Sequence, residues 1–418
     1  EDPGALLAGL DPEQRLVAEA IRGPVVVMAG AGTGKTRAIT HRIAYAVARG
    51  EHDPARTLAV TFTNRAAGEM SRRLAGLGVG GVRVRTFHSA ALRQLRWAWP
   101  QAIGGEMHDV IASKSSLVAT AASQNRLASD PATVRDVATE IEWAKVMQVS
   151  PEDYPQMASL HGRRGPGGLT IEQAAAVYDS YERVKRSAGR IDFEDVLLLT
   201  VGVLEDRDDL RRQVQASFAH FTVDEYQDVS AVQERLLRVW LGDRDDVCVV
   251  GDVAQTIYSF AGADPSHLLQ FANRFDDAQV IPLVRCYRCT PQIVQVAEDI
   301  LGGGVVSAQL LSTTKARRVP LQSQVDDGPA PSVRQYADEP SEAAAVVRQI
   351  RQLVAAGTPA REIAILVRIN ALTEQFESAL ADAGIAYSVR GGRRFFDRPE
   401  VRRGVSLLRG AARGATTI

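Results

Sequence analysis

Short apolar runs alternate with longer amphipathic stretches along this chain. Five of the runs are rich in β-branched residues and end at turn formers or charged residues, which is typical of buried strands. They are "PVVVMAG" (24–30), "TLAVTF" (57–62), "VRVRTF" (82–87), "FAHFTVDE" (218–225) and "DVCVVGD" (246–252). Because helical patterns lie between them, the sequence predicts an α/β fold with a parallel sheet.

Helical periodicity dominates the middle of the chain, between 90 and 215. The stretch "IEQAAAVYDSYERVKRSAG" (171–189), for example, has apolar residues at helical spacing. We therefore expect a helical insertion domain at 90–215, placed between the two parts of a first α/β domain, 1–89 and 216–280.

A second α/β pattern follows the first. We expect the strand "VIPL" (280–283) to begin this second domain, which would cover 281–396 and be incomplete. The expected elements are strands at 331–337, 362–368 and 385–392 and helices at 340–356 and 371–383. Residues 397–418 are expected to begin a second helical insertion.

Bulk composition narrows the class of protein. A chain of 418 residues favours two or three domains, and 45% hydrophobic with 24% charged residues is ordinary for a soluble globular protein. No apolar run reaches the roughly eighteen residues of a membrane span, and the N-terminus lacks a secretory signal, so we expect no membrane partner. Three cysteines favour a reducing compartment, the cytoplasm. The net charge of −1 requires any nucleic-acid binding to use local grooves.

A glycine-rich loop, "MAGAGTGKT" (28–36), follows the first predicted strand and opens a helix. Its pattern is A-x-x-x-x-G-K-T, with Ala29 where the strict phosphate-loop motif has glycine. Glycines can take backbone angles that turn successive N–H groups around a phosphate. We expect Lys35 to reach the β- and γ-phosphates of ATP and the Thr36 hydroxyl to bind Mg²⁺. The residues expected to bind the nucleotide here are Gly30, Ala31, Gly32, Thr33, Gly34, Lys35 and Thr36.

The alternative for this loop is an ordinary glycine-rich turn, but the order of strand, Lys-Thr and helix favours the phosphate loop. A carboxylate on a neighbouring strand is needed to hold Mg²⁺, and "FTVDEYQD" supplies one. We expect Asp224 to be the metal ligand and Glu225 the base that polarises the attacking water. A solvated acidic loop is the alternative for this pair.

These motifs resemble those of the UvrD/PcrA/Rep group of superfamily-one DNA helicases, and the resemblance runs nearly end to end. Within the group, the chain is most similar to the second UvrD-type helicase of actinobacteria, on "RTFHSAALRQLRWAWP", "IEWAK" and "WLGDRDD". Further similar segments are "LDPEQRLVAEA" (10–20), "TFTNRAAGEM" (61–70), "IDFEDVLLLT" (191–200), "VVGDVAQTIYSFAGAD" (249–264) and "CYRC" (286–289).

The resemblance implies two RecA-like domains that hydrolyse ATP between them and move 3′ to 5′ on single-stranded DNA. It implies that Gln14, Arg37 and Tyr287 hold the base, and that Gln255 and Arg288 act at the γ-phosphate beside Lys35 and Glu225. The DNA-side candidates are Thr61, Phe62, Thr63, Asn64, Phe87, His88, Phe193, Tyr258 and Phe260. The alternative for several of these aromatic residues is a place in the core.

The family's last two motifs are missing, so the chain is expected to be C-terminally truncated. A working helicase that acts on single-stranded DNA and duplex junctions, in repair and at the bacterial nucleoid, is the first hypothesis. A motor fragment that binds ATP and DNA without productive unwinding is the second, and the motor part of a helicase–nuclease is a weaker third.

The C-x-x-C spacing of Cys286 and Cys289 has three interpretations. A zinc site needs four ligands, and no second Cys or His pair stands at a plausible spacing. A redox pair is the second interpretation, because this spacing can close a disulfide. The resemblance favours the third, an ATP-site motif, because "CYRC" stands where the family has N-Y-R-S.

Overall fold

The computed structural model describes residues 2–302, 320–390 and 404–405. The chain divides into two compact units, the first unit Glu1–Ala330 and the second unit Pro331–Ile418. This division differs from the boundary that we expected at 281. The predicted second helical insertion at 397–418 lies outside the described residues, apart from 404–405.

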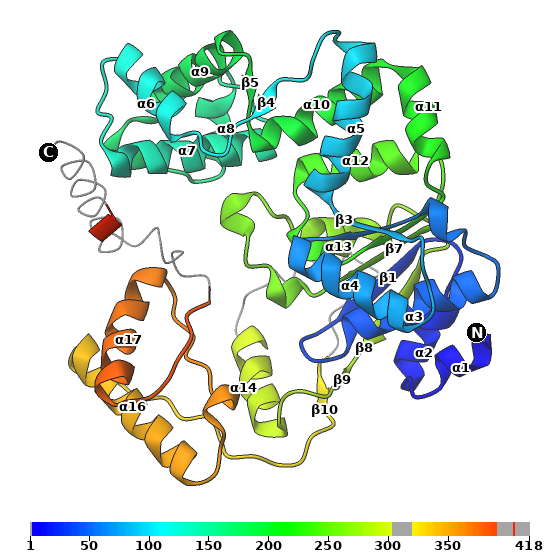
Figure 1. Cartoon of the computed structure of the whole chain (residues 1–418), viewed down its shortest axis with the longest axis vertical. Coiled ribbons are helices and arrows are strands. Elements are labelled where there is room, and N and C mark those ends of the chain that lie inside the picture. The colour runs from blue at the N-terminus through cyan, green and yellow to red at the C-terminus, as the bar shows by residue number, and fades with distance from the viewer. Residues whose placement is uncertain (1, 303–319, 391–403, 406–418) are drawn as a thin grey trace, which may run out of the picture. The chain divides into compact units, whose positions relative to one another are not determined.

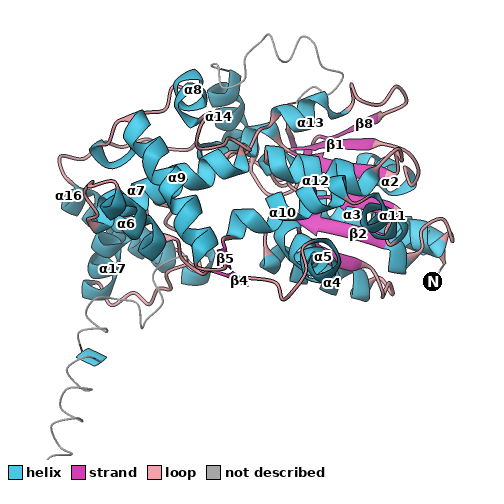
Figure 2. Cartoon of the chain, turned by 90° about the horizontal axis from the view of Figure 1, so that it is seen from above, coloured by secondary structure: helices cyan, strands magenta, loops and turns pink. Residues whose placement is uncertain are grey.

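A six-stranded sheet, entirely parallel, forms the centre of the first unit (Figures 1 and 2). Its order is β3-β2-β6-β7-β1-β8. The strands are β1 Val25–Ala29, β2 Thr57–Thr61, β3 Arg83–Thr86, β6 His220–Val223, β7 Val247–Gly251 and β8 Gln279–Leu283. All five strands predicted for the first α/β domain are therefore confirmed.

Strand β8 corrects one expectation. We expected "VIPL" to begin the second domain, but this segment pairs along the whole of β1, from Val25 opposite Gln279 to Ala29 opposite Leu283. Ile281 and Leu283 are buried with the side chains of β1 on one face of the sheet. The sheet that a parallel strand joins depends on which distant strand it pairs with. The residues of the strand itself do not show which partner that is.

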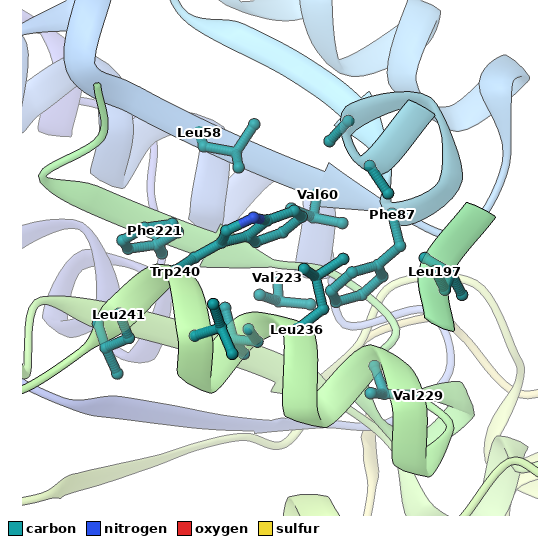
Figure 3. Close-up of a cluster of buried hydrophobic side chains, with 14 of the residues drawn as sticks. Leu58, Val60, Phe87, Leu197, Phe221, Val223, Val229, Leu236, Trp240 and Leu241 are labelled. Carbon is teal, nitrogen blue, oxygen red and sulfur yellow. The ribbon is translucent and has the colours of Figure 1, made fainter. Parts of the chain in front are cut away.

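Helices cover both faces of the sheet, which explains why β1, β2 and β7 are buried along their whole length. Alternate residues of β1 point to opposite faces, so Val26 and Met28 belong to one core and Val25 and Val27 to the other. Helices α1 to α4 cover the second face, while α5 and α10 to α13 cover the first (Figures 1 and 2). The first core centres on Trp240, which lies between Phe87 and Phe221 (Figure 3).

The helices of the sheet layers are α1 Pro3–Leu7, α2 Pro12–Glu19, α3 Lys35–Ala48, α4 Asn64–Gly76, α5 Phe87–Ala102, α10 Phe193–Asp206, α11 Asp208–Ala216, α12 Ala231–Leu241 and α13 Ser266–Phe271. Four further helices, α6 Ser115–Gln124, α7 Pro131–Val146, α8 Tyr154–Leu160 and α9 Ile171–Ser187, enclose a separate apolar core. A short parallel pair, β4 Asp109–Val110 and β5 Arg190–Ile191, stands between these two groups in the chain. The segment between β3 and β6 is thus mostly helical, but α5, α10 and α11 pack on the sheet.

The first unit ends with β9 Arg285–Cys286, α14 Pro291–Gly302 and β10 Gln322–Ser323, and β9 pairs in parallel with β10. In the second unit, α16 Glu339–Ala355 and α17 Thr373–Asp382 confirm both predicted helices. They pack through Val347, Ile350 and Leu380. Over the described residues of this chain, no helix is long and apolar enough to cross a membrane.

The strands predicted at 331–337, 362–368 and 385–392 were wrong where the structure describes them. Residues 391–392 lie outside the described residues. In the described part, Val333 is 100% exposed and Leu366 93% exposed, so their apolar side chains are not buried as strand positions would require. A β-rich sequence becomes a strand only when a neighbour satisfies its backbone N–H and C=O groups, and here no neighbour does so among the described residues.

Candidate active site

The glycine-rich loop joins the end of β1 to the start of α3, as the sequence predicts. Gly32 (φ 75°) and Gly34 (φ 80°) have left-handed backbone angles that favour glycine. Gly34 is the N-cap of α3 and offers no side chain to the first backbone N–H groups of the helix. These N–H groups, at the positive end of a 14-residue helix, suit a phosphate.

Gly30 has little room for a side chain because of close packing, and not because of its backbone angle. Its backbone angle is not left-handed, but a Cβ at this position would lie 2.5 Å from Leu321 Cδ2. Gly32 is crowded as well, because its Cβ would lie 2.8 Å from Arg288 Cβ and 2.9 Å from Cys286 Sγ. The loop is therefore packed tightly beneath the segment that follows β8.

Two acidic residues follow β6 and face the phosphate loop. Glu225 accepts a hydrogen bond from Lys35 Nζ at 2.8 Å, and Glu225 has a left-handed backbone (φ 52°). Asp224 is 8% exposed, and its carboxylate accepts the backbone N–H of Glu225 at 3.0 Å. Burial, together with the charge of Glu225, raises the pKa of Asp224 to about 6, against the opposing effect of Lys35. A buried carboxylate with this cost of ionisation, in the electrostatic field of Lys35 of the phosphate loop, fits a hard cation such as Mg²⁺.

A chain of hydrogen bonds extends from the acidic pair, through residues that the sequence interpretation missed. Gln227, which is buried, donates from Nε2 to Glu225 Oε2 at 2.9 Å. Its Oε1 accepts the backbone N–H of Asp252 at 3.0 Å, and the Asp252 carboxylate accepts Gln255 Nε2 at 2.9 Å. Gly251 permits this approach, because a Cβ there would lie 2.5 Å from Gln227 Oε1. The signal was present in the sequence as polar residues at the ends of two buried strands, β6 and β7.

The residues expected around the base come together on the other side of the loop. Gln14 Nε2 donates to the carbonyl oxygen of Thr33 at 3.0 Å. The Tyr287 hydroxyl donates to Asp11 Oδ2 at 2.7 Å, and 49% of Tyr287 is exposed. Arg37, also exposed, donates to the carbonyl oxygen of Gly9 at 2.9 Å. Three distant parts of the chain thus form one wall beside the phosphate loop.

Arg288 is exposed and lies directly against the phosphate loop at Gly32. The expected second domain, 281–396, would contain Arg288, but β9 and its following turn belong to the first unit. The backbone N–H of Tyr287 donates to the carbonyl oxygen of Gly32 at 3.0 Å, which fixes this turn to the loop. In the described structure no carboxylate pairs with the Arg288 guanidinium, so its charge is available to a phosphate.

Exposed aromatic rings form two groups in the first unit. Phe62 stacks on Tyr258 at a centroid distance of 4.7 Å, and Tyr258 lies 6.2 Å from Phe260. His88 stacks on Phe193 at 3.8 Å, and 53% of Phe193 is exposed. Burial, with the charge of Lys114, lowers the pKa of His88 to about 4, so the ring is neutral at neutral pH. Both groups can offer a face to a base.

Thr63 and Asn64 are exposed at the start of α4, as a DNA contact requires, but two other DNA-side candidates are buried. Phe87 is 5% exposed and packs parallel to Trp240 at a centroid distance of 5.8 Å. Thr61 is 2% exposed, and its hydroxyl donates to the carbonyl oxygen of Thr63 at 3.1 Å.

These two assignments are corrected on physical grounds. Phe87 and His88 are the first residues of α5, and successive side chains of a helix point about 100° apart. Phe87 therefore enters the core, while His88 is half-buried and stacks on the exposed ring of Phe193. Thr61 ends the buried strand β2, and its hydroxyl is bonded to the turn that follows, so its side chain is not exposed to a ligand.

The class of protein follows from this geometry. A parallel strand leads through a glycine-rich loop into a helix that begins Lys-Thr, and a buried carboxylate follows another strand of the same sheet. This arrangement defines a P-loop nucleotide-binding protein. Residues 10–276 match the family model of the UvrD/REP helicase N-terminal domain, and residues 281–416 match that of the UvrD-like helicase C-terminal domain. The chain belongs to the UvrD/REP helicase family.

Individual proteins of this family show which members the chain is similar to. The chain is 47% identical over 414 residues to ATP-dependent DNA helicase UvrD2 of Mycobacterium tuberculosis. The aligned region covers 96% of this chain and 58% of that protein. It is 32% identical over 410 residues to ATP-dependent DNA helicase PcrA of Bacillus subtilis, covering 97% of this chain and 53% of that protein. The family resemblance is confirmed, and the chain spans little more than half the length of these relatives.

Proposed function

We propose that this chain is the motor part of an ATP-dependent DNA helicase, which moves 3′ to 5′ along single-stranded DNA and opens duplex junctions. The observation that carries the proposal is the hydrogen-bonded path from Lys35 through Glu225 to Gln255. Gln255 stands three residues before Tyr258, in the same loop as the exposed ring of Phe260. Nucleotide contacts and a base-stacking surface therefore share one short segment.

Each residue has a role in this proposal. The amides of residues 30–36 and Lys35 bind the phosphates, Gln14, Arg37 and Tyr287 hold the base, and Arg288 with Gln255 meets the γ-phosphate. Thr36 and Asp224 would hold Mg²⁺, which supplies charge neutralisation at the phosphates. Glu225, once released from Lys35, orients and deprotonates the attacking water.

The relatives' names support DNA as the partner, and the exposed rings of Phe62, Phe193 and Phe260 support single-stranded DNA in particular. Stacking on aromatic rings tolerates any base, which suits a translocating motor. We place its work in DNA repair, at the nucleoid of a bacterial cytoplasm.

The test is the ATPase rate of the 418-residue chain with and without single-stranded DNA, with Lys35→Ala as the blank. Arg135→Ala, at an exposed residue of α7, is the matched control for loss of a positive charge. We expect stimulation by DNA that Lys35→Ala abolishes and Arg135→Ala retains. Strand displacement from 3′-tailed and 5′-tailed duplexes then tests polarity.

A motor fragment that binds ATP and DNA without unwinding is the second candidate. The observation that favours it is the 58% coverage of the mycobacterial relative. Nucleotide and DNA binding with a flat ATPase rate would establish the fragment and reject the working motor.

A further inference from the structure

Two cysteines flank the turn that touches the phosphate loop. Cys286 ends β9, and the backbone N–H of Cys289 donates to Cys286 Sγ at 3.5 Å. Both cysteines are free, and the Cys286 thiol is close enough to Cys289 to affect its pKa. Thiols this close in a C-x-x-C turn can form a disulfide with a small movement of the side chains.

The two thiols differ in what they contact. Cys286 is fully buried, and its sulfur occupies the space in which Gly32 could not carry a Cβ. Cys289 is partly exposed, so a small molecule can reach it. The pair therefore joins an accessible thiol to one that contacts the phosphate loop.

The turn between the cysteines is held on both sides. Tyr287 is bonded to Gly32 through its backbone, and the Ser323 hydroxyl donates to the carbonyl oxygen of Cys289 at 2.7 Å. The backbone N–H of Gln324 donates to the carbonyl oxygen of Cys286 at 2.8 Å. Because the ends are fixed, a new bond between the sulfurs must be accommodated by the side chains and by the residues between them, Tyr287 and Arg288.

We propose that Cys286 and Cys289 form a thiol–disulfide switch that acts on the nucleotide site, an inference that rests on the proposed function of that site. The Cys289 thiolate attacks a low-molecular-weight disulfide and releases one thiol. The Cys286 thiolate then attacks Cys289 Sγ and releases the second thiol. The protein loses two hydrogen atoms and two sulfur–hydrogen bonds, and the external disulfide is reduced to two thiols.

Closure brings the sulfurs to a bond length of about 2.05 Å and so changes the position of the Cys286 sulfur that packs against Gly32. Tyr287 and Arg288 are then confined to one turn geometry and cannot adjust to ATP. Burial, with the neighbouring Cys286 thiol, raises the pKa of Cys289, so closure should accelerate as the pH rises.

The test treats the reduced 418-residue chain with glutathione disulfide and follows intact mass, binding of a fluorescent ATP analogue and ATPase rate. We expect the loss of two hydrogen atoms, about tenfold weaker nucleotide binding or turnover, and full recovery with dithiothreitol. Cys289→Ser should stay active and insensitive. Cys248→Ala removes the third cysteine, which is buried in β7, and should behave like the parent chain.

Absence of the mass change would overturn the switch, as would a disulfide that leaves nucleotide binding unaltered. The same conclusion follows if Cys289→Ser and the second variant Cys289→Ala both remain sensitive. Failure of the proposed function is separate, because it appears as no ATPase in the fully reduced chain, while mass and nucleotide binding still report on the switch.

Discussion

Lys35 Nζ and Glu225 Oε2 lie 2.8 Å apart, so the phosphate-loop lysine and the proposed base bind each other in the structure. Glu225 also has a left-handed backbone, which costs roughly 1–3 kcal/mol for a residue with a side chain. A γ-phosphate that replaced the carboxylate as the partner of Lys35 would leave Glu225 free to meet water. We propose that nucleotide binding activates the base by this exchange of partners.

Replacing Glu225 with glutamine should separate binding from hydrolysis. The amide can still accept a hydrogen bond from Lys35 but cannot take a proton, so we expect the ATPase rate to fall about 10²–10⁴-fold with nucleotide affinity retained. Lys35→Ala should lose both. Glu69→Gln, at an exposed residue of α4 paired with Arg73, is the control and should change neither. A Glu225→Gln variant that hydrolyses ATP normally would remove Glu225 from the mechanism.

The buried carboxylate of Asp224 should make stability depend on pH when no metal is present. Its folded pKa, about 6, lies above the ordinary value of 3.8, so the folded state holds a proton that the unfolded state releases between these values. Ionised Asp224 therefore destabilises the fold above pH 6, and this cost disappears as the pH falls towards 4.

Asp224→Asn should raise the free energy of unfolding by about 2–3 kcal/mol at neutral pH and by almost nothing near pH 4. Urea unfolding in the presence of EDTA at these two pH values measures the difference. Asp136→Asn, at an exposed residue of α7, should show no such pH dependence. An equal effect of Asp224→Asn at both pH values would contradict the burial argument.

Two phenylalanines, one exposed and one buried, should differ in whether their loss affects DNA binding or stability. Phe193→Ala removes an exposed ring stacked on His88 and should weaken single-stranded DNA binding by about 1–3 kcal/mol without loss of stability. Phe87→Ala removes a buried ring beside Trp240 and should lower the free energy of unfolding by about 3–5 kcal/mol.

Fluorescence anisotropy with labelled oligonucleotides and thermal unfolding distinguish the two effects. Leu160→Ala is the control, because Leu160 is an apolar residue of α8 with 71% exposure and no aromatic partner among the described residues. If Phe87→Ala weakened DNA binding while leaving stability intact, our placement of this ring in the core would be wrong.

A buried ion cluster should be essential for the insertion helices. Lys145 of α7 donates to Asp192 at 2.7 Å and to Glu182 at 3.0 Å, and it is only 2% exposed. Burial alone would lower the pKa of Lys145, but these carboxylates and Asp195 raise it well above its ordinary value. Asp192 is the N-cap of α10, whose first residue is Phe193.

Lys145→Met leaves these three carboxylates with Lys185 as their remaining cationic partner and should still lower the free energy of unfolding by roughly 3 kcal/mol. Arg183→Met breaks an exposed pair with Asp179 on α9 and should cost less than about 1 kcal/mol. Urea denaturation compares the two variants. Equal costs would mean that the buried cluster contributes no more than a surface pair.

The sequence alone determined the parts of the site that depend on neighbouring residues in the chain. The phosphate loop is nine contiguous residues, 28–36, and its glycines, Lys35 and Thr36 act through local backbone geometry. The strands β1, β2, β6 and β7 were predictable as well, because burial on both faces leaves apolar runs. The partly exposed strand β3 was predictable from its β-branched residues. Asp224 and Glu225 could be placed because parallel strands bring their carboxyl ends to one edge of the sheet.

Only the tertiary structure decided what depends on partners from distant parts of the chain. Whether Phe87 or His88 faces the core is set by the rotation of α5 against Trp240, and the sheet that β8 joins is set by its pairing with β1. Cys286 packs against Gly32, although the two residues are far apart in the sequence. The hydrogen bond from the backbone N–H of Asp252 to Gln227 joins the ends of two different strands, β7 and β6. Such contacts are fixed by the free energy of the whole fold, which local sequence patterns do not contain.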